Sequence, residues 1–165
     1  MTDKRLTLTE SNARSAYQKA SKSKKEWMRE MYPDFNFERG LLERIETYVD
    51  ACNELGFNPL TISDFSSLPE MDRESSYAYH QLTIIARVLN EGWEPDYSNE
   101  NEYKYYPYFV WDNKAAGGSG FSCFDRYFGR SYSHVGSRLV FKTRELAIHA
   151  GKKFNSIYNQ YLKLE

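Results

Sequence analysis

The stretch YKYYPYFVW, residues 103–111, decides the fold, because here the hydrophobic period changes from that of a helix to that of a strand. Aromatic residues occupy positions of both parities, so both faces of the expected strand are apolar. Pro107 has no N–H to donate to a neighbouring strand. The stretch therefore predicts an edge strand or a bulged one.

Two further strands are expected after it. Glycines at positions 117, 118 and 120 predict a turn into a second strand near Phe121–Phe124. A third strand is predicted at Ser137–Lys142, with Leu139 and Phe141 on one face and Arg138, Val140 and Lys142 on the other. Thr143 then caps a closing helix.

The closing helix carries apolar residues at helical spacing, namely Leu146, Ala150, Phe154, Ile157 and Tyr161. Alternation along the third strand places Leu139 and Phe141 on the face toward the closing helix, whose apolar stripe faces the same layer. We expect a shared core of Leu139, Phe141, Leu146, Phe154 and Ile157.

The chain before residue 93 has a helical pattern after a short strand at Leu6–Leu8. Thr9 is the expected N-cap of a helix at Glu10–Ala20, and further helices are expected at Lys24–Met31 and Leu41–Leu55, the last ended by Gly56. Ser67 and Glu70 have the spacing of a capping box, which predicts the start of a long helix that Gly92 ends.

The fold class is therefore α+β: a helical N-terminal part, an antiparallel three-stranded meander and a C-terminal helix. We expect a single domain over residues 1–165, mainly helical over 1–92, with the sheet and closing helix over 103–165. Its 165 residues suffice for one core, and the 16% aromatic content must enter that core or a binding surface.

Composition excludes several classes of protein. No apolar run approaches the ~20 residues of a membrane span, and the N-terminus lacks the apolar core of a secretory signal, so a cytoplasmic protein is expected. Cys52 and Cys123 cannot form a disulfide framework, and with three scattered histidines they have no zinc-ligand spacing. We expect no metal and no cofactor.

Charge is segregated along the chain despite a net charge of −1. Counted along the sequence, residues 56–102 hold two basic and nine acidic side chains, whereas residues 103–165 hold ten basic and four acidic ones. Either the two segments pack together and balance each other, or each meets a different partner.

Four segments resemble a known group of proteins. They are LTIIARVLNEGW (residues 82–93), EYKYYP (102–107), GFSC (120–123) and SRLVFKTRELA (137–147). They are similar to an uncharacterised family of small proteins encoded by phages and prophages of Bacteroidota-like bacteria, over most of the chain after about Arg44. Family members often have cysteine where this chain has Val140, a departure that weakens a thiol role there. The resemblance implies a phage setting and carries over no activity.

No catalytic constellation is visible in the sequence. Cys123 and His134 flank one loop and could pair as thiolate and base, but no third group orients them, and a buried strand cysteine explains Cys123 better. The glycines at 117–120 precede a strand and lack the Lys-Ser/Thr pair of a phosphate loop. The carboxylates between Glu91 and Glu102 have the spacing of a polar loop. We therefore expect no enzyme.

Aromatic and basic residues of the C-terminal half form the candidate partner-binding surface: Tyr106, Tyr108, Arg126, Arg130, Arg138 and Lys142. The hypothesis is a phage-encoded, anti-CRISPR-like protein that inhibits a host defence effector, itself a nucleic-acid-handling protein, by stoichiometric protein contact. The alternative is a nucleic-acid or nucleotide-binding module that uses an aromatic and basic sheet face. A minor virion protein is a third interpretation. The same cations could instead only balance the acidic segment.

Overall fold

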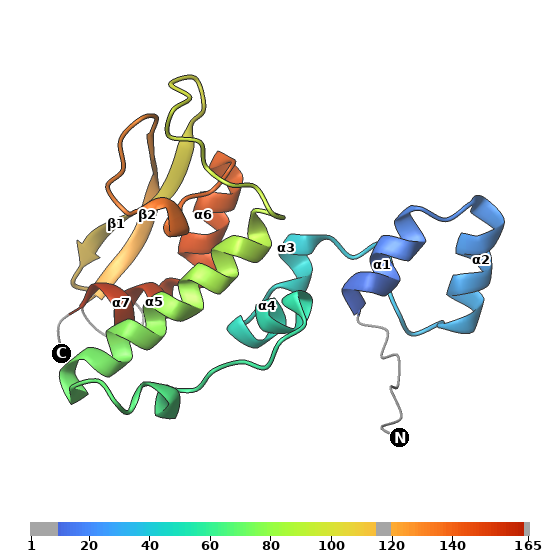
Figure 1. Ribbon diagram of the computed structural model, residues 1–165, viewed down its shortest axis with the longest axis horizontal. Coiled ribbons are helices and arrows are strands. Elements are labelled where there is room, and N and C mark those ends of the chain that lie inside the picture. Colours follow the sequence, from blue (N-terminus) through green and yellow to red (C-terminus); the bar gives the residue numbers. More distant parts are fainter. Residues whose placement is uncertain (1–9, 115–119, 164–165) are drawn as a thin grey trace.

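The computed structural model describes residues 10–114 and 120–163 and has the predicted α+β class (Figure 1). In chain order its elements are α1 (Glu10–Gln18), α2 (Lys22–Met31), α3 (Leu41–Arg44), α4 (Tyr48–Leu55), the 3-10 helix η1 (Ile62–Phe65), α5 (Glu70–Leu89), β1 (Lys104–Asp112), β2 (Gly120–Gly129), the 3-10 helix η2 (Ser137–Leu139), α6 (Arg144–Lys153) and α7 (Asn155–Leu162). The expected strand at Leu6–Leu8, its neighbour Thr9 and the turn at residues 117–119 lie outside the described residues.

The central element is α5, which lies between α4 on one side and the α6–α7 pair with the β1–β2 hairpin on the other (Figure 1). Ala78, Leu82, Ile85 and Leu89 repeat at steps of three and four and are all at most 2% exposed. Burial of each leucine or isoleucine contributes roughly 1.5–3 kcal/mol. This stripe fixes α5 in the core.

The predicted core between the C-terminal segments is confirmed. Leu139, Phe141, Leu146 and Phe154 belong to the same buried cluster as the α5 stripe, and Ile157 packs against it. The N-cap of α6 is confirmed as well, since the hydroxyl of Thr143 accepts the backbone N–H of Leu146 at 3.3 Å. The closing helix is nevertheless two helices, α6 and α7, because the backbone is kinked at the buried Phe154.

The predicted third strand at Ser137–Lys142 is wrong. The segment begins as η2 and meets β1 at one isolated bridge, where Tyr105 and Phe141 exchange backbone hydrogen bonds of 3.0 and 2.7 Å. The sheet in the described part of the chain therefore has two antiparallel strands.

Asn90, the C-cap of α5, holds the backbone on both sides of this bridge. Its side-chain Nδ2 donates to the carbonyl of Val140 at 2.8 Å, and its Oδ1 accepts the backbone N–H of Lys142 at 3.0 Å. These backbone groups are thus bonded to α5 and not to another strand. The expected alternation also fails, since Val140 is as buried as its neighbours Leu139 and Phe141.

The predicted helix at Leu41–Leu55 is interrupted between α3 and α4. Thr47 and Asp50 form a capping box that starts α4, with Asp50 N–H donating to the Thr47 hydroxyl at 3.1 Å and Thr47 N–H to the carboxylate at 2.8 Å. Gly56 ends α4 in the left-handed conformation, as predicted, with φ of 76°.

The capping box expected at Ser67 and Glu70 is not formed, and Pro69 precedes α5 without a side-chain cap. A box forms earlier, at η1, between Thr61 and Asp64, and these hydrogen bonds lower the pKa of the Asp64 carboxyl. Gly92 lies just beyond the end of α5, with φ of 79°.

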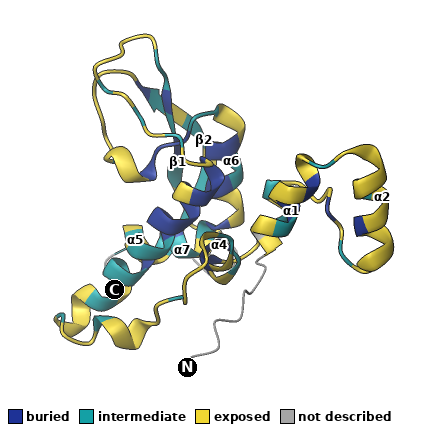
Figure 2. Ribbon diagram, turned by 45° about the vertical axis from the view of Figure 1, so that its right-hand side comes forward, coloured by how far each residue is buried: buried dark blue, intermediate teal, exposed yellow. Residues whose placement is uncertain are grey.

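The helices α1 and α2 form a small hairpin beside the main body (Figure 1). Its own buried cluster is Tyr17, Met28 and Phe37, with the rings of Tyr17 and Phe37 stacked at 4.7 Å. In Figure 2 the buried residues concentrate along α5 and α6, whereas α2 is almost wholly exposed. The main core does not include this hairpin.

Candidate functional site

The β1–β2 hairpin has one face against helices and one face free of them. The ring of Phe109 lies 4.7 Å from that of Tyr158 on α7, and the side chains of Pro107 and Cys123 lie against Gly151 on α6. Because side chains alternate across a strand, the neighbours of these residues point to the opposite face. We call the opposite side the outer face.

Tyrosines occupy the outer face. The rings of Tyr106 and Tyr108 lie 6.0 and 6.4 Å from that of Tyr127 on the paired strand. Tyr106 is buried, at 8% exposure, whereas Tyr108 and Tyr127 are 47% and 52% exposed. Burial, and then the neighbouring Tyr127 and Tyr132, raise the pKa of the Tyr106 hydroxyl. Tyr106 is therefore the buried ring of this group, and Tyr108 and Tyr127 are its exposed rings.

A β-bulge adds a further exposed ring. The register shifts between Tyr108 and Phe109, which pair with Asp125 and Cys123, so Phe124 is the extra residue of β2. Phe124 is 72% exposed and thus is not packed beneath α6 or α7. We call the exposed rings Tyr108, Phe124, Tyr127 and Tyr132 the hairpin aromatic surface.

The cations predicted beside these rings lie elsewhere on the hairpin. Arg126 pairs in register with Pro107, which faces α6, so Arg126 shares the helix-facing side. Arg130 stacks on Tyr103 at 4.6 Å and donates to its hydroxyl. The Tyr103 ring contacts that of Phe128. Phe128 pairs in register with Tyr105, which packs against the main core.

The other two predicted cations lie next to α5. Lys142 forms a 2.7 Å ion pair with Glu91, so for this residue charge balance within the chain is the observed role. Arg138 is exposed on η2, beside α5. The structure therefore brings Tyr106 and Tyr108 together, with Tyr127, but does not gather the four predicted cations around them.

The hypothetical thiolate–base pair does not form. Cys123 lies against Gly151 on the helix-facing side, where burial raises the pKa of its thiol. His134 lies by the ring of Tyr106, at 6.1 Å, on the outer face. The hairpin separates the two groups, and Cys123 is a strand cysteine that is partly, not fully, buried.

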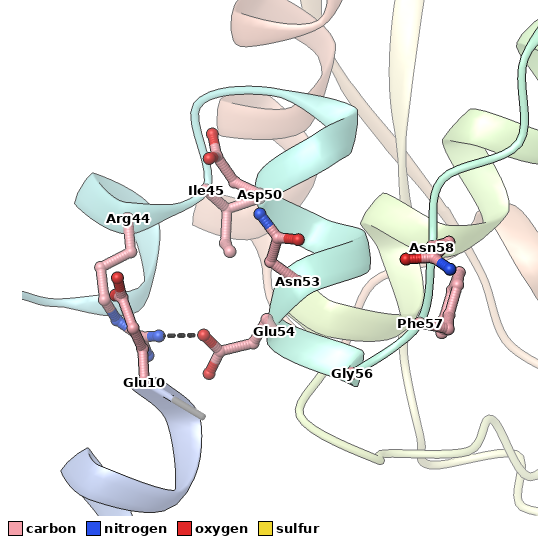
Figure 3. Close-up of a pocket in the computed structure, with 9 residues that line it drawn as sticks. All are labelled: Glu10, Arg44, Ile45, Asp50, Asn53, Glu54, Gly56, Phe57 and Asn58. Carbon is pink, nitrogen blue, oxygen red and sulfur yellow. Dashed lines mark hydrogen bonds and ion pairs between the residues drawn. The ribbon is translucent and has the colours of Figure 1, made fainter. Parts of the chain in front are cut away.

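A hollow of about 390 Å³ lies between the start of α1 and α4 (Figure 3). Arg44 forms an ion pair with Glu54 across it, Arg14 bonds to Glu10 at 3.5 Å, and Asp50 belongs to the capping box of α4. Each carboxylate thus has a structural partner. These contacts lie within α1, between α3 and α4, and at the start of α4, so none of them joins α1 to α4.

Within residues 10–114 and 120–163, no group of three or more histidine, cysteine, aspartate or glutamate side chains is placed to hold a metal ion. Over the same residues, no helix combines the length and the apolar character that crossing a membrane requires. No protein family, no curated protein and no solved structure matches the chain.

Proposed function

We propose that this chain is a phage-encoded binding protein that inhibits a host defence effector by stoichiometric protein contact, as an anti-CRISPR protein does, without catalysis. The observation that best supports it is the hairpin aromatic surface, whose four rings are between 47% and 72% exposed. Rigid rings supply contact area at a low cost in side-chain entropy, and tyrosine is enriched at protein interfaces.

The placement of charge favours a protein partner over nucleic acid. A surface for single-stranded nucleic acid needs cations beside its stacking rings to contact phosphates. Here Arg126 lies on the helix-facing side of the hairpin and Arg130 is held by Tyr103, while Tyr108 and Tyr127 lie on the outer face. Asp125, opposite Tyr108 in the register, lies 4.0 Å from both Arg126 and Arg144, so these two cations are paired with a carboxylate of the chain.

The test is capture from a lysate of a Bacteroidota-like host, followed by titration of the captured protein with the purified chain. We expect its activity to be lost at a fixed molar ratio. Phe124→Ala and Tyr127→Ala should each weaken binding about thirtyfold, the equivalent of roughly 2 kcal/mol for a central interface ring.

The matched control is the double variant Trp27→Ala, Met31→Ala on α2. It removes side chains of similar exposure, 53% and 56%, that lie far in sequence from the β1–β2 hairpin. This control should bind like the parent. Equal losses in control and test variants would contradict the proposed surface, and inhibition at strongly substoichiometric amounts would show turnover.

The alternative, a nucleic-acid-binding module, gives a different result in one experiment. Replacement of Arg126, Arg130, Arg138 and Lys142 by alanine should then weaken binding for all nucleic-acid sequences and flatten the salt dependence, because fewer counterions are released. With a protein partner, the same four changes should leave affinity nearly unchanged.

A further inference from the structure

Two hollows meet along the exposed side of α5. One, of about 500 Å³, is lined by the second half of α5, the turn after it and η2; the other, of about 650 Å³, lies beside the first half of α5. Thr83 and Arg138 line both, so the two hollows adjoin at Arg138. We call the 500 Å³ hollow the Arg87–Arg138 hollow, after the two arginines in its lining.

The contacts of these two arginines differ from those of the other described arginines. Both are exposed, and neither Arg87 nor Arg138 has an ion-pair or hydrogen-bond partner among the described residues. Every other arginine in that part of the chain contacts a carboxylate, a carbonyl or a hydroxyl oxygen, the last being Arg130 on Tyr103. Two unpaired guanidinium groups at one hollow create a positive potential that an anion would relieve.

The neighbouring carboxylates do not neutralise this pair. Glu91, one helical turn after Arg87, is held by Lys142 at 2.7 Å. Glu94 lines the hollow as its one carboxylate among the described residues, which leaves the lining with a net charge of +1. The positive lining predicts an anionic ligand, and guanidinium groups match the oxygens of a phosphate in two-point contacts.

The turn after α5 brings an aromatic ring to the same hollow. Glu91 is a non-glycine residue with φ of 50°, and Gly92 follows with φ of 79°. These two left-handed residues fold the chain back, so that the Trp93 N–H reaches the Asn90 carbonyl at 3.0 Å and the indole lines the hollow. Left-handed backbone at a non-glycine residue is costly and is often retained at binding sites.

We propose that the Arg87–Arg138 hollow binds a phosphate-bearing ligand, with the phosphate between the two guanidinium groups and an attached ring, such as a nucleobase, against Trp93. Thr83 and Asn90, both buried and hydrogen-bonded, hold the floor in place. This site is separate from the hairpin aromatic surface, so its failure would leave the proposed function untouched.

The experiment is calorimetric titration of the full chain with inorganic phosphate, with adenosine monophosphate and with adenosine. We expect the monophosphate to bind more tightly than phosphate, and adenosine not to bind. Arg87→Gln and Arg138→Gln should each weaken both anions at least about tenfold, since a charge-assisted contact contributes more than a neutral one. Trp93→Ala should remove the advantage of the monophosphate over phosphate and leave phosphate binding intact.

Arg144→Gln is the matched control, because Arg144 is similarly exposed but lies on α6 with a carboxylate 4.0 Å away. It should bind all three probes like the parent, and melting curves should show each variant folded. Absence of binding by both anions, or equal losses in the Arg144 and Arg87 variants, would overturn the site. Equal affinity for phosphate and the monophosphate would overturn the role of Trp93.

Discussion

The side-chain amide of Asn90 donates a hydrogen bond of 2.8 Å to the carbonyl oxygen of Val140, and so joins the end of α5 to the segment after η2. The same side chain accepts the backbone N–H of Lys142. One buried side chain thereby satisfies two backbone groups that flank the bridge between Phe141 and Tyr105. It does so where a third strand was expected.

Asn90→Ala should therefore lower the free energy of unfolding by about 2 kcal/mol or more, because it leaves the Val140 carbonyl and the Lys142 N–H without partners. Urea unfolding followed by circular dichroism measures the loss. The control is Asn58→Ala, since Asn58 is exposed, and that change should have little effect. An Asn90 variant as stable as the control would show that water replaces both hydrogen bonds.

Truncation of a buried and of an exposed phenylalanine should affect stability very differently. Phe154 is 3% exposed in the main cluster, and its truncation to alanine should cost about 3–5 kcal/mol. Phe124 is 72% exposed, so the same truncation should change the free energy of unfolding by less than about 0.5 kcal/mol while it weakens binding to the partner. Chemical denaturation of both variants provides the comparison, and similar losses in the two would contradict the assignment of Phe124 to the surface.

The helices with strong apolar periodicity were predictable from the sequence, as was the closing core. The predicted stripe residues Leu146, Ala150 and Phe154 are buried, because burial accounts for apolar residues at that spacing. The strand predicted at Ser137–Lys142 is reduced to one bridge at Phe141, and its expected alternation fails because Val140 is buried and bonded to Asn90, fifty residues away. A long-range side-chain contact leaves no local pattern.

The candidate site was predictable in part. Tyr106 and Tyr108 do lie together, because Pro107 marks the strand and alternation places both on one face. The separation of Arg126 from these rings depends on the bulge at Phe124, whose position within β2 the sequence does not indicate. Likewise, Arg87 and Arg138 meet only through the packing of η2 on α5.

Stability should fall in mildly acidic solution. Burial, and then Arg87, lower the pKa of His80 from 6.5; burial, and then Lys153, lower that of His149. These two histidines bind protons more readily in the unfolded chain. Their contribution to the free energy of unfolding is therefore fully present above about pH 6.5 and is lost as the pH falls through the folded-state pKa values. Urea unfolding between about pH 7.5 and 5 measures this. The double variant His80→Gln, His149→Gln should have a flatter profile, and an unchanged profile would assign the effect to other groups.

Gly151 allows α6 to approach the hairpin, and Gly151→Ala should destabilise the protein. A Cβ there would lie 2.5 Å from the Cys123 sulfur and 2.7 Å from the Pro107 Cβ, so the hairpin must shift. Alanine usually stabilises a helix interior by up to ~1 kcal/mol over glycine, but overpacking costs about 1–3 kcal/mol, so a net loss is expected. Gly40→Ala is the control, because nothing lies within 4 Å of its Cβ position. In urea unfolding, Cys123→Ala should restore part of the loss in the Gly151 variant; a Gly151→Ala variant more stable than the parent would show that the helix and hairpin separate without cost.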